Sequence, residues 1–244
     1  MFSSKADIIS QLQKDILLLQ GLKAPSPGNT GNTGLGPLHA AFPNNSFPLA
    51  GVHEFLSKRK EDSAATGGFV AGLLATLIQS HGVIVWISLS RTIFPPALKL
   101  FGIEPDRIIF VDLQKEKEVL WAMEEALKCN GLSAVVGEMN EINFTESRRL
   151  QLAIEQSSVA GFILRRQSNK QNTIASVSRW KITSLPSIPD DDLPGVGFPR
   201  WNVELLKIRN GKPGTWQMEW SGGKFRYIFP VINSLSQELK RKTG

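Results

Sequence analysis

A stretch that could bind the phosphates of a nucleotide follows the first apolar run and reads EFLSKRKEDSAATGGFVAG. In parallel α/β sheets, phosphates bind where the first strand joins the first helix, because unpaired backbone N–H groups and the helix dipole face the ligand there. A phosphate-loop ATPase needs G-x-x-x-x-G-K-[ST] at this place, with lysine for the phosphates and a hydroxyl for Mg²⁺. Here Phe69 follows the two glycines, and neither required residue is present. The sequence therefore predicts a degenerate nucleotide loop, formed by Ser63, Thr66, Gly67 and Gly68.

An acidic residue that could complete such a site follows a later apolar run, SAVVGEMNEI. Glu138 stands at the end of this run, where an ATPase places a metal-coordinating acid, and Glu141 follows it. Without the lysine and the Mg²⁺-binding hydroxyl, this carboxylate has little nucleotide to act on. The pattern favours a capping or interface role for Glu138, and we expect neither a catalytic residue nor a cofactor.

The histidines and the cysteine indicate no other catalytic or metal site. His39, His53 and His81 are widely separated, and the sequence contains no G-x-S-x-G elbow or H-E-x-x-H pair. A single cysteine, Cys129, cannot form an internal disulfide, which fits a reducing cytoplasm. No apolar run approaches the roughly 18 residues that a membrane span needs. We therefore expect a cytoplasmic protein without a metal, a targeting segment or membrane contact.

The elements that must position these residues begin at Gly51, where short apolar runs start to alternate with helical patterns. Runs such as VIVWIS are apolar on both faces, which is typical of a parallel sheet covered by helices on each side. The predicted strands are Val52–Leu56, Val83–Ser88, Ile108–Val111, Ala134–Glu138 and Gly161–Leu164. The predicted helices are Gly67–Gln79, Pro95–Phe101, Glu116–Cys129 and Thr145–Ser157. Asn143 and Glu146 predict a capping box at the start of the last helix.

The helical patterns end after Lys170. The segments Ser176–Ser184, Arg200–Ile208 and Thr215–Ser221 alternate apolar with polar residues, so we expect antiparallel strands that extend the sheet. The six tryptophans of the chain lie mostly inside predicted strands or helices and are expected to pack in the core; they are Trp86, Trp121, Trp180, Trp201, Trp216 and Trp220. Trp180 has a second possible role, because basic residues flank it and an exposed ring there could stack on a nucleic-acid base.

The chain divides into four predicted regions. Residues 1–22 form an amphipathic helix, residues 23–48 a flexible linker rich in Pro, Gly and Asn, residues 49–230 the α/β domain, and residues 231–244 a basic tail. The apolar face of the first helix consists of Ile8, Ile9, Leu12, Ile16 and Leu19. This face can dock on a partner or pack on the helix's own domain, and the sequence leaves both alternatives open.

Several segments together resemble the ImuA family. They include LAGVHEF, VIVWISLSRTIFPPALKLFGIEPDRIIFV, the tract from VLWAMEEAL to RRLQLA, SVSRWKI and PRWNVELLKIRNGKPGTWQMEW, and they span about Leu49 to Trp220 in order. The resemblance implies a RecA-like α/β fold, with a mostly parallel sheet flanked by helices and extended by C-terminal antiparallel strands. ImuA-like proteins belong to bacterial damage-inducible mutagenesis cassettes, beside ImuB, a Y-family-like polymerase homologue. The resemblance therefore implies an accessory factor in translesion synthesis with an ImuB-like partner and, as a further partner, RecA.

The resemblance also implies roles for individual residues. Ser90 stands where RecA has its catalytic glutamate, and AATGGF replaces the glycine-lysine-threonine of the phosphate loop. RecA binds single-stranded DNA through loops between its later strands, and a net charge of +6 would suit such a ligand. The matching residues here are Arg165, Arg166, Lys170, Arg179 and Lys181. RecA docks its N-terminal helix on the neighbouring subunit, which implies partner docking by the first helix.

Two other functions compete with this interpretation. A DNA-dependent ATPase could use an unorthodox phosphate loop built from Ser63 to Gly68. A cell-division inhibitor of the SulA type is the second alternative, because such inhibitors resemble the same degenerate RecA fold. They are shorter, however, and lack the long segment PRWNVELLKIRNG, which favours the repair role.

Overall fold

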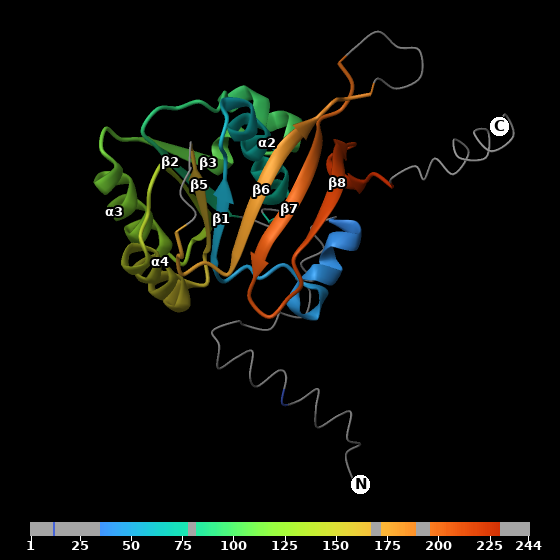
Figure 1. The fold of residues 1–244 in the computed structure, drawn as a ribbon. Coiled ribbons are helices and arrows are strands. Elements are labelled where there is room, and N and C mark those ends of the chain that lie inside the picture. Colours follow the sequence, from blue (N-terminus) through green and yellow to red (C-terminus); the bar gives the residue numbers. More distant parts are fainter. Residues whose placement is uncertain (1–11, 13–34, 78–81, 167–171, 189–195, 230–244) are drawn as a thin grey trace, which may run out of the picture.

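The computed structural model describes residues 12, 35–77, 82–166, 172–188 and 196–229. Nine strands form one sheet in the order β3-β2-β4-β5-β1-β6-β7-β8-β9 (Figure 1). The strands are β1 Val52–Leu56, β2 Val83–Ser88, β3 Ile108–Asp112, β4 Leu132–Met139, β5 Ala160–Arg165, β6 Ser178–Leu185, β7 Arg200–Ile208, β8 Gly214–Ser221 and β9 Lys224–Tyr227. Strands β1 to β6 pair in parallel, and β6 to β9 pair in antiparallel fashion. The predicted sheet, mostly parallel and extended by C-terminal antiparallel strands, is confirmed.

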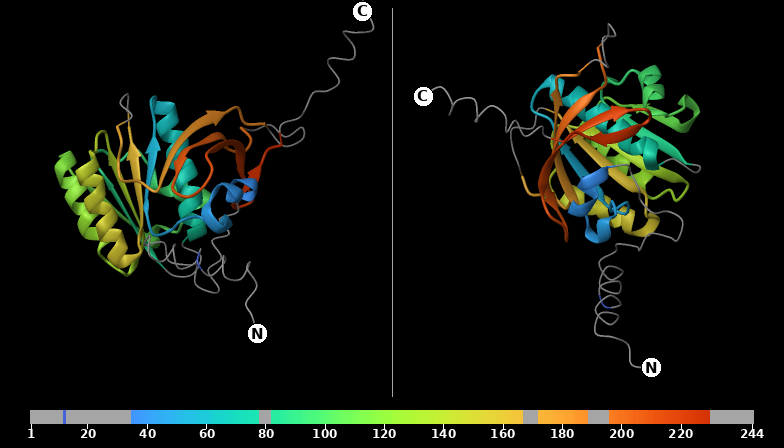
Figure 2. Two further views of the ribbon diagram at one scale, coloured as in Figure 1. Left: turned by 60° about the horizontal axis from the view of Figure 1, so that its bottom comes forward. Right: turned by 90° about the vertical axis from the view of Figure 1, so that its right-hand side faces the viewer.

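Helices cover both faces of the parallel half, as the two-sided apolar strands predict. The α-helices are α2 Lys60–Leu77, α3 Glu116–Leu127 and α4 Phe144–Ser157. Helices α3 and α4 pack on one face, over a core that includes Val52 and Ile87. Helix α2 packs on the other face, over a core that includes Phe55 and Trp86 (Figure 2). Neighbouring residues of a strand thus belong to different cores, because side chains alternate across a sheet.

The start of α4 confirms the predicted capping box. The backbone N–H of Glu146 donates to the Asn143 side chain at 2.9 Å, and the Asn143 N–H donates to the Glu146 carboxylate at 2.8 Å. The predicted helix at Pro95–Phe101 is wrong in type, because the structure has the 3₁₀ helix η3 over these residues. Its two leading prolines remove backbone donors, and Gly102, at φ 83°, ends it.

The antiparallel half buries Trp180, Trp201 and Trp220 on the α2 side of the sheet, and Trp216 is partly buried there. The expected core packing is wrong for Trp121 on α3, which is 64% exposed. Trp180 is fully buried and stacks on Phe55 at a ring-centroid distance of 5.9 Å. The possibility that Trp180 is exposed and stacks on a base is therefore wrong. Strand β9 was not predicted, because it is only four residues long. It follows a tight turn at Gly222 and Gly223, which both have positive φ.

The second half of the predicted linker is part of the packed domain. Residues 35–48 include the 3₁₀ helices η1 Gly36–Ala41 and η2 Pro43–Asn45. Leu35, Leu38 and Phe47 are buried in the α2-side core, so the prediction of a flexible linker is wrong over this part. The apolar residues of this segment are spaced among turn residues and show no helical period in the sequence. They nevertheless pack into the core on the α2 side of the sheet.

His53 on β1 connects the segment of residues 35–48 to the sheet through hydrogen bonds. Its ring nitrogens contact the Pro48 carbonyl oxygen at 2.9 Å and the Ser178 hydroxyl at 2.7 Å. Burial lowers the pKa of His53 to about 3, so the ring is neutral at ordinary pH. His53 therefore has a structural role. Among the described residues, no helix is long and apolar enough to span a membrane.

Candidate functional site

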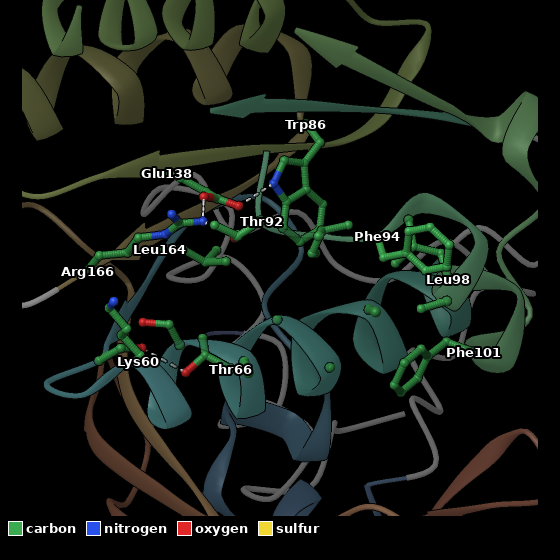
Figure 3. A pocket seen from close by; sticks show the side chains of 18 of the residues that line it. Lys60, Thr66, Trp86, Thr92, Phe94, Leu98, Phe101, Glu138, Leu164 and Arg166 are labelled. Carbon is green, nitrogen blue, oxygen red and sulfur yellow. Dashed lines mark hydrogen bonds and ion pairs between the residues drawn. The ribbon is translucent and has the colours of Figure 1, made fainter. Parts of the chain in front are cut away.

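A pocket of about 780 Å³ opens beside the first turns of α2, next to the end of β4 (Figure 3). All six residues of the predicted degenerate nucleotide site line it, although they come from three separate parts of the sequence. They are Ser63, Thr66, Gly67, Gly68, Ser90 and Glu138. The fold thus brings the predicted residues together, and their contacts indicate what the pocket can bind.

The predicted loop at this site is wrong, because its residues are helical. Helix α2 begins at Lys60, only four residues after β1 ends, and it continues through Gly67 and Gly68. The Ser63 N–H donates to the Arg59 carbonyl at 3.1 Å, and the Thr66 hydroxyl contacts that of Ser57 at 3.0 Å. A phosphate loop would instead leave several N–H groups open to an anion. From Ser63 onwards, the backbone N–H groups donate to carbonyl oxygens of the preceding turn.

The first turn of α2 already holds an anionic side chain. Asp62 accepts the Arg59 backbone N–H at 3.1 Å and pairs with the Arg59 guanidinium at 2.9 Å. The Asp62 side chain is only 5% exposed, and the hydrogen bond from Arg59 lowers its pKa. A carboxylate suits the positive end of the helix dipole. It occupies the position at the helix start that a phosphate would otherwise take.

The carboxylate of Glu138 is bound on both oxygens. The indole N–H of Trp86 donates to Oε1 at 2.7 Å, and the Arg166 guanidinium binds Oε2 and also contacts Thr92. Glu138 is almost fully buried, and burial lowers the pKa of Arg166. These contacts occupy the groups that a metal ion or a nucleophilic water would need. Within the described residues, no cluster of three His, Cys, Asp or Glu side chains could hold a metal ion.

The other side of the pocket is apolar. Ile93, Phe94, Leu98 and Phe101 line it from η3 and the residues before it, and Trp201 lines it from β7. Sequence reasoning missed these residues, because their apolar side chains were attributed to a helix and to core packing. The run IFPPALKLF, apolar around two prolines, was the signal that could have revealed a surface-exposed apolar segment.

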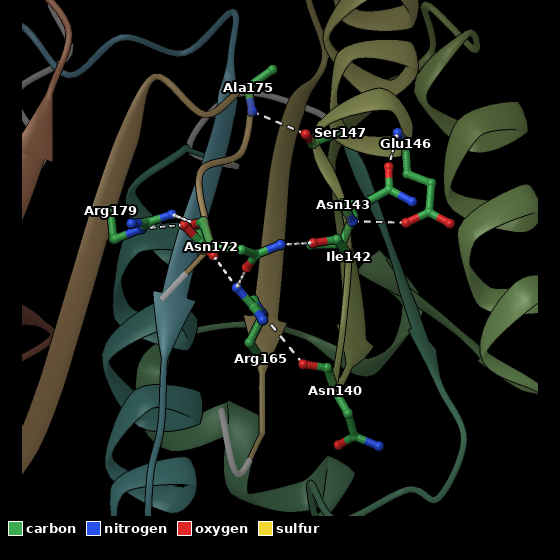
Figure 4. Close-up of polar contacts among 10 residues, drawn as sticks. Asn140, Ile142, Asn143, Glu146, Ser147, Arg165, Asn172, Ala175 and Arg179 are labelled. Atoms are coloured by element: carbon green, nitrogen blue, oxygen red, sulfur yellow. Dashed lines mark hydrogen bonds and ion pairs between the residues drawn. The ribbon is translucent and has the colours of Figure 1, made fainter. Parts of the chain in front are cut away.

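The residues predicted to bind DNA mostly bind carboxylates of the protein. Arg165 is 2% exposed and pairs with Glu54 at 2.9 Å, and Arg179 pairs with the same carboxylate at 2.5 Å. Both arginines also contact Asn172, which fixes the segment before β6 (Figure 4). The prediction that Arg165 contacts phosphate is therefore wrong, because its side chain does not reach the surface.

Of the other three residues predicted to bind DNA, Arg166 binds Glu138, and Lys181 pairs with Glu204 at 2.7 Å. Lys170 lies outside the described residues. The four described residues of this set each bind a carboxylate, so they do not form a free basic surface.

The predicted docking face of the first helix lies almost entirely outside the described residues. Leu12 is described; it is helical and 54% exposed. Ile8, Ile9, Ile16 and Leu19 are not described. Docking through this helix stays a prediction.

Comparisons with known proteins bear on fold and family. No family model matches the chain. A solved structure of the RadB recombinase superposes with a TM-score of 0.59 at 10% identity, covering 82% of this chain and 100% of that one. This likeness confirms the RecA-like fold class. The Cell division inhibitor SulA of Photorhabdus laumondii is 28% identical over 105 residues, which are 43% of this chain and 59% of that protein.

A longer and closer match is found with Protein ImuA of Caulobacter vibrioides, in two strains. The identity is 35% over 229 residues, which cover 88% of this chain and 93% of the relative. The match includes nearly the whole sequence, and it agrees with the segments that carry the resemblance. The chain therefore belongs to the ImuA family.

Proposed function

We propose that this protein is a non-catalytic, RecA-like accessory factor in damage-induced translesion synthesis, and that it recruits or positions an ImuB-like polymerase homologue. Membership of the ImuA family supports the repair setting. The observation that carries the non-catalytic role is the course of α2, which occupies the place of a phosphate loop with regular helix. RecA and single-stranded DNA are further proposed partners.

Phosphoryl transfer requires a cradle of N–H groups, a cation on the phosphates and an acid or water-positioning residue. At this site the helix uses the N–H groups, Asp62 occupies the helix start, and Glu138 is bound by Trp86 and Arg166. The N–H cradle and the acidic residue are therefore each opposed by a specific contact, and the lysine of a phosphate loop is absent from the sequence. Binding of partners is the function that such a domain can still perform.

An ATPase assay tests the non-catalytic part of the proposal. The purified protein, with and without single-stranded DNA, is expected to release no phosphate above a protein-free control. Glu138→Gln and the exposed Glu141→Gln serve as a matched pair of variants. Hydrolysis that is lost in Glu138→Gln and kept in Glu141→Gln would contradict the proposal and support the ATPase alternative.

A pull-down tests the partners. The tagged full chain is recovered from damage-induced cells of its own host, with and without nuclease. The ImuB-like homologue is expected to be recovered in both samples, because a scaffold binds protein directly. Recovery that depends on intact nucleic acid would instead assign DNA binding as the primary function.

The similarity to SulA over 105 residues favours one second candidate, an inhibitor of cell division. That function predicts filamentous cells on overexpression and direct binding to the tubulin-like division GTPase. Normal cell length on overexpression would exclude it.

A further inference from the structure

The apolar side of the pocket beside α2 is not explained by the loss of nucleotide chemistry. Phe94, Leu98 and Phe101 converge there, while Glu138 and Arg166 lie at the opposite end (Figure 3). Trp201 also lines the pocket. A concave apolar site with a few polar groups at one end is the usual form of a ligand or peptide pocket. The lining is thus suited to a ligand that is apolar over most of its length.

Several apolar residues that line the pocket or neighbour its lining in the sequence have exposed side chains. Phe94 is 68% exposed and Leu100 is 76% exposed, both on or beside η3. Val196 is 86% exposed and Phe198 is 36% exposed, and they directly precede Pro199, which lines the pocket. A group of exposed apolar side chains around a pocket is typical of a surface that contacts another protein. A small polar metabolite would leave this rim uncovered.

The polar end of the pocket carries one cation without a carboxylate partner. Arg166 and Glu138 neutralise each other, whereas Lys60 lines the pocket and forms no ion pair within the described part of the chain. The nearby Asp62 is bound to Arg59 and does not compensate it. A ligand with a carboxylate close to its apolar part would complement this charge. A phosphate finds fewer open backbone donors here than in a phosphate loop, because the N–H groups of α2 from Ser63 onwards are used within the helix.

We propose that the pocket holds an aromatic or branched aliphatic side chain of a protein partner, with a neighbouring carboxylate of that partner paired to Lys60. The proposal rests on the proposed binding function and adds the docking site and the chemistry of the docked segment. The partner segment inserts its apolar side chain between α2 and η3, and residues around it cover Phe94 and Phe198.

A fluorescent probe of matching chemistry tests the pocket directly. Anilinonaphthalene sulfonate combines aromatic rings with an anion, and its fluorescence rises on transfer to an apolar site. Ala64 is exposed on α2 and lines the pocket, so Ala64→Trp is expected to fill it and to weaken probe binding at least tenfold. Ala40→Trp, at an exposed position outside the pocket, is the control and is expected to bind like the parent protein. Equal binding by both variants would overturn the proposal.

A second pair of variants tests the charge. Lys60 and Lys58 are both exposed, but only Lys60 lines the pocket. Lys60→Glu is expected to weaken binding of the same probe about three- to tenfold, the range of an exposed ion pair that is lost and reversed. Lys58→Glu changes the net charge equally and is expected to have a smaller effect. Loss of affinity of the same size in both variants would refute a specific role of Lys60.

The purified ImuB-like protein then tests the occupant. It is expected to displace the probe, to bind the parent chain and both control variants, and to lose affinity for Ala64→Trp and Lys60→Glu. Unchanged binding to these two variants would overturn the docking site while the proposed function stands. Failure to bind the parent chain would refute the proposed function and, with it, the assigned occupant. Thermal melts that match the parent protein verify that each variant is folded.

Discussion

Replacement of Glu54 by glutamine tests the buried ionic cluster that binds two of the supposed DNA-binding arginines. Glu54 is completely buried, and its carboxylate pairs with Arg165 at 2.9 Å and with Arg179 at 2.5 Å. The arginine side chains are only 2% and 13% exposed. Glu54→Gln keeps the shape of the side chain and removes its charge, so both guanidinium groups lose their counterion. Water cannot replace it at this depth.

The expected loss of folding free energy is about 3–5 kcal/mol, the usual cost of breaking a buried ion pair by removing one partner. In a domain of this size, roughly 2–4 °C of melting temperature is lost per kcal/mol, so the midpoint should fall by roughly 6–20 °C. Urea unfolding followed by tryptophan fluorescence measures the first quantity, and a thermal melt measures the second.

The control is Glu204→Gln, which removes the partner of Lys181 from a pair whose side chains are 25% and 32% exposed. Its loss should be at most about 1 kcal/mol, because solvent screens an exposed pair. A loss of less than about 1 kcal/mol for Glu54→Gln would refute the reasoning. It would mean that solvent reaches Arg165 and Arg179, and the DNA-binding role would then regain support.

Three further predictions concern stability. The pKa of His53 is lowered to about 3 in the folded state, whereas an unfolded histidine titrates near 6.5. Below about pH 6.5 the unfolded state therefore binds more protons than the folded state. The free energy of unfolding should fall by about 2 kcal/mol between pH 7 and pH 5. Urea titrations of the parent protein and of His53→Gln measure this loss, which the variant should lack. Gly67→Ala should stabilise α2 by about 0.5–1 kcal/mol, because alanine favours the helix and the new Cβ would lie at an ordinary distance of 3.6 Å from Ile93. Gly72→Ala should destabilise the fold, because its Cβ would lie only 2.7 Å from the Phe225 side chain. Thermal melts of the two variants should therefore shift in opposite directions, and equal shifts would contradict the packing at Gly72. Asn143→Ala should cost about 0.5–2 kcal/mol through loss of the capping box, measured by urea unfolding; an unchanged midpoint would show that the cap does not contribute.

Local patterns were sufficient to predict most of the sheet. Strand β2 was predicted to the residue from the run VIVWIS, and β7 from the alternation in Arg200–Ile208. The capping box of α4 was predicted because both of its residues lie within one turn. The absent lysine of the phosphate loop is a feature of the sequence itself. In each case the signal and its structural result are separated by only a few residues.

Only the tertiary structure decided how the site is built. Helix α2 continues through Gly67 and Gly68 because its face packs on the sheet and on Trp201, and this contact outweighs the low helix propensity of glycine. Arg165 is buried by its ion pair with Glu54, which lies 111 positions away in the sequence. A contact between two residues so distant in the sequence leaves no periodic signal, because it depends on where the fold places both residues.

The pocket arises in the same way, from side chains that stretch from Ser57 to Trp201. The sequence by itself determined the layered α/β fold and the loss of the phosphate-binding lysine. Tertiary packing determined that a helix and an apolar pocket lie where a phosphate loop would be. The physical reason is that hydrophobic periodicity is set by neighbouring residues, whereas burial and charge pairing are set by elements that meet only in the folded chain.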